Sequence, residues 1–205
     1  LLLNMADGQA IDSAAQNNLT LYGNAKLSTG QAKFGNTSLL LDGTGDYAEV
    51  TKTNYSFGTG DFTIECFARF DDLDQSFILS FWTTSGDSTP ILFYLNHEND
   101  SIIYYTGNAL RIETATNSIS ANQWYHLSVC RSSGSSKVFI NGTQSGSTYA
   151  SDTMDFKNKV LTIGASQANT TSRFQGYIDE VRISNMARYT SNFTAPTEPF
   201  PDKGQ

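Results

Sequence analysis

Apolar and polar residues alternate with a period of two along most of this chain, and helical periodicity is almost absent. Such alternation is typical of strands, whose successive side chains point to opposite faces. The runs are short and are separated by clusters of Gly, Asn, Ser, Thr and Asp, which favour turns. We therefore expect an all-β protein in which two antiparallel sheets pack as a sandwich or jelly roll.

The expected strands follow one another along the whole chain. Two of them, at residues 124–132 and 136–142, are expected to form a hairpin, and Asn141-Gly142 then supplies a turn that tolerates positive φ angles. Residues 184–192 are expected to form a short helix or an irregular segment. The expected strands span residues 1–5, 19–23, 25–29, 38–43, 48–51, 62–70, 75–84, 91–96, 101–107, 109–116, 124–132, 136–142, 160–166 and 174–184.

Length and charge narrow the classes of function. A chain of 205 residues suits one all-β domain. We place this domain at residues 1–194, followed by an extended Pro-rich tail at residues 195–205. The formal net charge is −7 and the basic residues are scattered, which argues against a nucleic-acid partner. No apolar run approaches the roughly 18 residues that a membrane helix needs, so we expect no membrane insertion.

The two cysteines are expected to face opposite sides of their sheet. In FTIECFARF, Cys66 shares its row with apolar residues and faces inward. In WYHLSVCRS, Leu127 and Val129 face inward, so Cys130 faces outward. This arrangement argues against a disulfide, and Cys66 is best interpreted as a small buried hydrophobic residue.

Four stretches resemble, in order, the parts of one known family. They are GNAKLSTGQAKFGNTSLLLDGTGDYAEV, GTGDFTIECFARF, NQWYHLSVCRSSGSSKVFINGTQ and FQGYIDEVRISNMARYTSNFTAPTEPFP. They resemble the laminin-G-like, concanavalin A-like lectin/glucanase jelly rolls, particularly those of bacteriophage tail and other virion proteins. Cys66 stands where an aromatic residue is usual, and His126 occupies the family's Trp-x-His strand, where we expect a structural role. The resemblance implies the fold far more specifically than the function.

The last expected strand raises a question of charge. In GYIDEVRIS, alternation places Asp179 in one row with Tyr177, Val181 and Ile183, which is the apolar row that we expect to face the core. An ionised carboxylate removed from water costs several kcal/mol unless it is paired. Asp179 therefore needs a partner.

Two kinds of partner remain open for Asp179. The resemblance implies a structural Ca²⁺, held by Asp179, by the carbonyl of Gly43 or the side chain of Asp42, and by Asp7 or a neighbouring carbonyl. Such oxygen ligands suit calcium, which takes about six to eight of them. The alternative is that the carboxylate accepts backbone N–H groups or pairs with an arginine such as Arg188.

Catalytic patterns are weak in this chain. Glucanases of this fold carry Glu-x-Asp-x-x-Glu on one strand, and the nearest match here is Glu98-Asn99-Asp100-Ser101-Ile102-Ile103, in which Ile103 takes the place of the acid/base. The chain has 2 histidines, so a His-rich zinc site is not expected. We interpret the protein as non-enzymatic.

Aromatic residues in the middle of the chain suggest a binding face. Related lectins stack a ring under a sugar and surround it with a few polar groups. Either these rings fill the sandwich core or some of them bind a ligand, and the candidates are Trp82, Tyr94, Tyr104, Tyr105 and Arg111.

The resemblance also implies a setting for the protein. The expected function is that of a tail-fibre, spike or capsid-decoration module of a phage virion, otherwise of an extracellular protein. The expected partners are host surface glycans or neighbouring virion proteins, and a homotrimer is the expected assembly of a fibre. The alternatives are a structural virion protein without a ligand, and a glycan-active enzyme or secreted adhesin.

Overall fold

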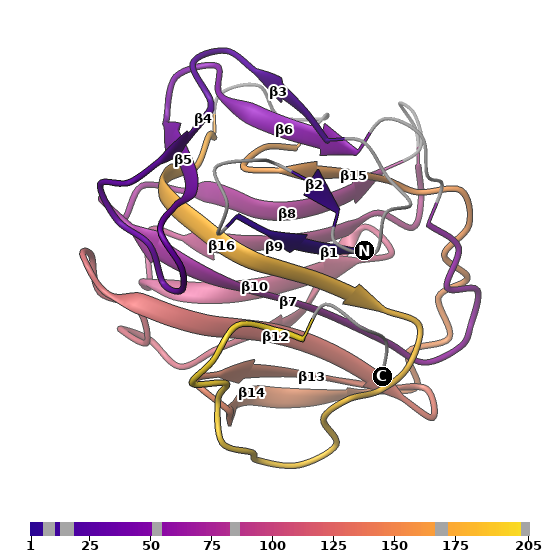
Figure 1. The fold of residues 1–205 in the computed structure, drawn as a ribbon. Helices are drawn as coiled ribbons and strands as arrows, with labels where there is room; N and C mark the ends of the chain where they lie inside the picture. Colours follow the sequence, from indigo (N-terminus) through magenta and orange to yellow (C-terminus); the bar gives the residue numbers. More distant parts are fainter. Residues whose placement is uncertain (6–10, 13–18, 51–54, 83–86, 167–171, 202–205) are drawn as a thin grey trace.

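Two antiparallel sheets pack face to face in this protein (Figure 1). The computed structural model describes the chain except residues 6–10, 13–18, 51–54, 83–86, 167–171 and 202–205. One sheet has nine strands in the order β14-β13-β12-β7-β16-β1-β2, with β5 also paired to β16 and β4 paired to β5. These strands are β1 (Leu2–Asn4), β2 (Ile11–Asp12), β4 (Lys26–Ser28), β5 (Ser38–Asp42), β7 (Phe62–Phe70), β12 (Trp124–Ser132), β13 (Ser135–Ile140), β14 (Thr143–Ala150) and β16 (Gln175–Ser184).

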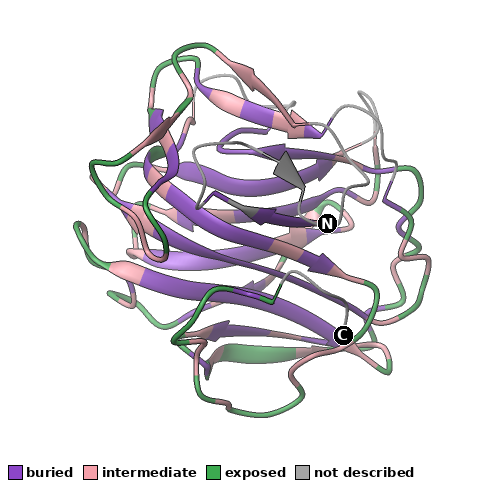
Figure 2. Ribbon diagram, viewed as in Figure 1, coloured by how far each residue is buried: buried purple, intermediate pink, exposed green. Residues whose placement is uncertain are grey.

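The second sheet has seven strands in the order β11-β10-β9-β8-β15-β6-β3. The predicted all-β sandwich is confirmed, and every strand expected from the alternation is present. Two strands, β2 and β14, were not predicted, and β14 is a largely exposed edge strand (Figure 2). The strands of this sheet are β3 (Leu19–Tyr22), β6 (Tyr47–Val50), β8 (Ser76–Trp82), β9 (Ile91–Asn96), β10 (Ser101–Thr106), β11 (Ala109–Glu113) and β15 (Val160–Ile163).

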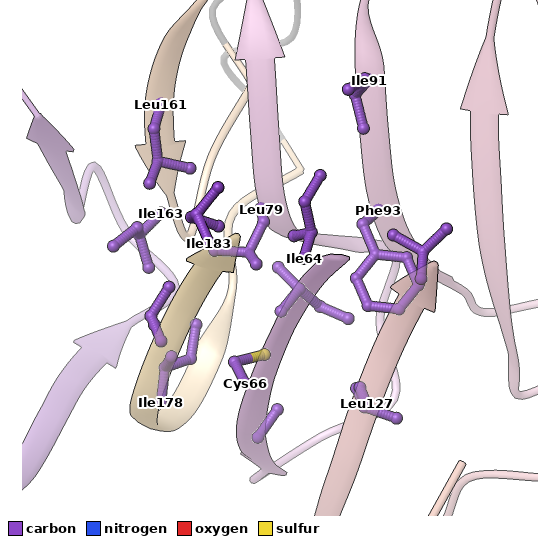
Figure 3. Packing of buried hydrophobic residues seen from close by; sticks show 14 of the residues in the cluster. Ile64, Cys66, Leu79, Ile91, Phe93, Leu127, Leu161, Ile163, Ile178 and Ile183 are labelled. Atoms are coloured by element: carbon purple, nitrogen blue, oxygen red, sulfur yellow. The ribbon is translucent and has the colours of Figure 1, made fainter. Parts of the chain in front are cut away.

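The hydrophobic core lies between the two sheets (Figure 3). Ile64 and Cys66 of β7 point into it and are fully buried, and burial of a large apolar side chain stabilises a fold by about 1.5–3 kcal/mol. Cys130 points the other way, where its sulfur lies 3.0 Å from the Thr63 hydroxyl. Both cysteines are free, as their predicted opposite orientations require.

A β-bulge in β16 corrects the prediction for Asp179. Asp179 pairs with Phe67 and Arg182 with Glu65, so β16 carries one more residue than β7 over this interval. Glu180 takes up the extra residue with a φ of 50°. Asp179 therefore lies on the outer face of the sheet beside Phe67, and the prediction that it shares the core row of Val181 and Ile183 is wrong.

The chain after β16 covers part of that outer face. Residues 185–201, which we call the strap, hold no helix and run back across the sheet as the yellow segment of Figure 1. The backbone N–H of Phe193 donates to the carbonyl of Gly142 at 2.9 Å. Phe200 is 3% exposed and packs with Leu2 and Phe67. The Pro-rich segment, as far as Pro201, thus lies on the domain.

The predicted hairpin is confirmed. β12 pairs with β13, and Asn141 and Gly142 turn the chain into β14 with φ angles of 50° and 81°. His126 is buried, with Nε2 3.1 Å from Glu65 Oε2. Across the described ranges, the structure holds no helix that is long and apolar enough to cross a membrane.

Candidate functional site

The outer face of the seven-stranded sheet carries the candidate site. On β9, Phe93 belongs to the core, so Tyr94 points to the outer face. On β10, Tyr104 belongs to the core, so Ile103 and Tyr105 point outward. Tyr94 and Tyr105 are both partly exposed. Two of the predicted ligand-binding tyrosines therefore share one face.

The register brings an acidic side chain to the same place. Ile103 of β10 pairs with Tyr94 on one side and with Glu113 of β11 on the other. Two strand spacings of about 4.8 Å place the backbones of Tyr94 and Glu113 about 10 Å apart. Tyr105, two residues from Ile103, lies about 7 Å further along the same strand. The pKa of Tyr94 is raised by burial, by Tyr105 and by the charge of Glu113.

Three hydrogen bonds fix the Glu113 carboxylate. Its Oε1 accepts from Asn96 Nδ2 at 3.0 Å, from Asn99 Nδ2 at 2.8 Å and from Ser101 Oγ at 2.8 Å. The bond from Asn99, followed by those from Ser101 and Asn96, lowers the pKa of Glu113 below its ordinary value. Within the described part of the chain, Oε2 accepts no hydrogen bond. The carboxylate is thus ionised at neutral pH and has one oxygen available to a ligand.

Two turns produce this arrangement. Gly107 and Asn108 have φ angles of 57° and 55°, as a two-residue type I′ turn requires, and they join β10 to β11. A register shift between Tyr104 and Tyr105 then sets Glu113 opposite Ile103. The β9–β10 turn presents the Asn99 donor directly beside that position.

Apolar residues form the floor of the site. Phe77, Leu92 and Ile103 are 5%, 9% and 3% exposed, and none of them belongs to the core cluster between the sheets. The ring of Tyr94 lies against that of Phe77, with centroids 5.2 Å apart. Tyr94 and Tyr105 therefore lie beside buried apolar side chains on this face.

The remaining predicted ligand-binding residues lie elsewhere. Tyr104 is fully buried and its hydroxyl donates to Asp152 Oδ2 at 3.1 Å, so it is removed from the candidate set. Arg111 donates to the carbonyls of Thr106 and Gly107, and its guanidinium lies 4.9 Å from the ring centroid of Tyr149 on the other sheet.

Trp82 is on the same sheet as Tyr94 but at the other end of β8. It pairs with Val160, whereas Phe77 pairs with Tyr94. The strand rise of about 3.3 Å per residue separates Trp82 from Phe77 by about 16 Å. The sequence interpretation missed Glu113, which only the register between β10 and β11 brings opposite Ile103.

The predicted calcium ligands do not converge among the described residues. Asp179 Oδ2 accepts from the N–H groups of Lys33 and Phe34 at 3.0 and 3.1 Å, and Oδ1 accepts from the N–H of Glu180 at 2.9 Å. Burial nevertheless raises the pKa of Asp179 to about 6. Asp42 pairs with Gln175, so about 13 Å of β16 separates it from Asp179.

The other predicted ligands are Gly43 and Asp7. Gly43 follows Asp42, and Asp7 lies outside the described residues. Among the described residues, no group of three or more His, Cys, Asp or Glu side chains could hold a metal ion. The described carboxylates of the predicted set, Asp42 and Asp179, do not lie together, and in the structure Asp179 has the backbone N–H partners of the alternative. Arg188 is engaged elsewhere, because its Nε donates to Ser184 Oγ.

A second cluster of ionisable groups lies sealed under the strap. Glu65 accepts from Arg182 Nε at 2.7 Å and from the Tyr189 hydroxyl at 2.9 Å, with His126 Nε2 3.1 Å away. Burial opposes ionisation of Glu65, but the hydrogen bond from His126 and the charge of Arg182 hold its pKa below the ordinary value. Glu65 and His126 are both fully buried. This pair therefore stabilises the strap and is closed to a substrate.

A sandwich of two antiparallel sheets, with two tyrosines and a carboxylate on one outer face, has the architecture of the lectin-like jelly rolls. The chain belongs to the concanavalin A-like lectin/glucanases superfamily, whose Laminin_G_3 profile matches residues 42–191. No curated protein sequence matches the chain.

Several solved structures share the fold. The binding domain of Paraclostridial Mosquitocidal Protein 1 is similar with a TM-score of 0.66 and 16% identity, over 85% of this chain and 45% of that one. A carbohydrate binding module from Bacillus subtilis has a TM-score of 0.52 and 16% identity, over 81% and 94%. Domain 4 of an extracellular arabinanase from Geobacillus stearothermophilus, in complex with arabinotriose, has a TM-score of 0.53 and 18% identity, over 83% and 82%.

Proposed function

We propose that this protein is a non-enzymatic glycan-binding domain whose site is formed by Tyr94, Tyr105 and Glu113. One observation carries the proposal: two partly exposed tyrosines and a fixed carboxylate with an available oxygen share one face above an apolar floor. A sugar has the complementary chemistry, because its C–H groups pack on aromatic rings and its hydroxyls hydrogen-bond to carboxylates.

Two arrangements support a function without catalysis. Glu98 and Asp100, the nearest match to a glucanase motif, lie in the β9–β10 turn and not on one strand face. Ile103, which takes the place of the acid/base, is buried in the floor of the site. The Glu65–His126 pair, which resembles an acid/base pair in composition, is sealed from solvent.

Binding to a panel of oligosaccharides tests the proposal. We expect at least one glycan to bind at millimolar concentration or below, and Tyr94→Ala and Tyr105→Ala each to weaken binding about tenfold. Tyr177→Ala is the matched control, because Tyr177 is a partly exposed tyrosine on the other sheet. Unchanged affinity in both site variants, or a panel without a single binder, contradicts the proposal.

The setting proposed for this domain is a phage virion, as part of a fibre, spike or decoration protein. The resemblance of residues 187–194, ARYTSNFT, to phage proteins supports it. In a homotrimer, three weak sites would act together through avidity. Cryo-electron microscopy of the native assembly tests this setting. A native assembly that is not a phage particle contradicts it.

A further inference from the structure

Within the described strands of the seven-stranded sheet, the face that carries the proposed glycan site has an acidic group and no free basic group. In sequence, Arg111 is the one basic residue within the seven strands of this sheet. Its guanidinium is engaged by the carbonyls of Thr106 and Gly107 and lies against Tyr149 of the other sheet. Recognition of an acidic sugar usually requires an arginine or lysine that is available to the ligand. The strands around Tyr94 offer none.

The Glu113 carboxylate is held as an acceptor. Three donors saturate Oε1, which leaves Oε2 as the atom that a ligand can reach. These hydrogen bonds lower the pKa of Glu113, so at neutral pH a ligand meets a carboxylate at this position. A hydroxyl can donate to Oε2, whereas a ligand carboxylate or sulfate would bring a like charge against it.

We propose that the site selects neutral, hydroxyl-rich glycans and excludes acidic ones, and that Glu113 is the residue that determines this specificity. This inference rests on the proposed function and adds the class of ligand. Tyr94 and Tyr105 supply the apolar contact, which a neutral and an acidic sugar share. Glu113 supplies the distinction between them.

A single substitution should change this specificity. In Glu113→Gln, the amide oxygen can still accept from Asn96, Asn99 and Ser101, and the amide nitrogen then takes the place of Oε2. The ligand would meet a neutral donor in place of a charged acceptor. The variant should therefore bind neutral glycans less tightly and tolerate acidic glycans better.

Calorimetric titrations with matched probes test the inference. The probes are lactose against sialyllactose and galactotetraose against tetragalacturonate, together with the strongest neutral binder of the panel and its oxidised, uronic-acid form. We expect the wild-type protein to prefer the neutral member of a pair at least tenfold. Glu113→Gln should weaken neutral binding about tenfold and reduce the preference to less than threefold. Glu49→Gln is the control, because it changes the net charge equally on β6 of the same sheet.

The wild-type protein provides a second readout that needs no variant. Salt screens like-charge repulsion, so acidic probes should gain affinity between low and 0.5 M salt while neutral probes do not change. Equal binding of acidic and neutral probes, with Tyr94→Ala weakening both about tenfold, overturns the specificity and leaves the proposed function intact. No binding of any probe, or binding that Tyr94→Ala does not alter, overturns both.

Discussion

Asp179 should make the protein less stable as the pH rises from 4 to 7. Burial raises the pKa of Asp179 from 3.8 to about 6 in the folded protein, although three backbone N–H groups oppose this shift. The folded protein therefore binds the proton more tightly than the unfolded chain does. The free-energy cost of ionising Asp179 in the folded protein is absent below about pH 3.8 and reaches its full value above about pH 6.

The magnitude follows from the two pKa values. A shift of about 2 pKa units corresponds to about 3 kcal/mol at 1.36 kcal/mol per unit. Between pH 5 and pH 7 the linkage relation assigns about 1.3 kcal/mol of this loss to Asp179. For a domain of this size, 1 kcal/mol corresponds to about 2–4 °C in the melting temperature.

Urea unfolding of the wild-type protein and of Asp179→Asn, at several pH values with EDTA present, measures this contribution. The free energy of unfolding of the wild type, minus that of the variant, should fall by about 1.3 kcal/mol from pH 5 to pH 7. A difference that rises with pH would refute the reasoning, because it would mean that the ionised carboxylate is favoured in the fold. Calcium bound to Asp179 would produce such a rise only in a parallel series without EDTA.

Three further predictions concern the fold around the sites. Glu65→Ala should lower the free energy of unfolding by about 3–5 kcal/mol in urea, because it leaves the buried His126 and the partly buried Arg182 without their shared partner; a loss below 1 kcal/mol contradicts this. The depressed pKa of Glu65 stabilises the wild type above about pH 4.5, and this stability is lost as the pH falls below that value. Gly142→Ala should release the strap, because a Cβ at this position would lie 2.1 Å from the carbonyl oxygen of Phe193. Faster hydrogen exchange at residues 186–193 would reveal the release. Tyr104→Phe should lower the melting temperature by a few degrees and leave glycan binding unchanged, since it removes only the buried bond to Asp152.

The sandwich could be predicted from the sequence because its strands are half-buried and alternate. β14 escaped prediction because it is an exposed edge strand whose residues are mostly polar, so that no apolar row marks it. The bulge in β16 escaped because Glu180 adopts a positive φ that nothing in its residue type signals. One residue in that conformation moved Asp179 from the predicted core row to the outer face.

The strap shows why a sequence resemblance does not settle a setting. Within ARYTSNFT, Tyr189 donates to Glu65 and stacks on Phe193 with ring centroids 3.5 Å apart. Asn192 Oδ1 accepts from the N–H of Gln144 at 2.9 Å. These contacts account for the motif through the stability of the fold, wherever the protein occurs.

The candidate site was predictable in part. Alternation in SIIYYTG puts Tyr104 and Tyr105 on opposite faces of their strand, so one of them must lie outside the core, and Tyr94 is among the predicted candidates. Glu113 could not be recognised as a site residue because its three donors come from another part of the chain, the β9–β10 hairpin. They meet Glu113 only through the register between β10 and β11, which depends on the shift after Tyr104.

The most direct test of the account is an NMR titration of the isotope-labelled protein with the strongest neutral glycan of the panel. The account predicts shift changes that cluster at Tyr94, at Tyr105 and at the Asn99 and Glu113 signals, with the side-chain amide of Asn99 among the largest. Changes that cluster on the nine-stranded sheet, or in loops remote from β9 to β11, would contradict it.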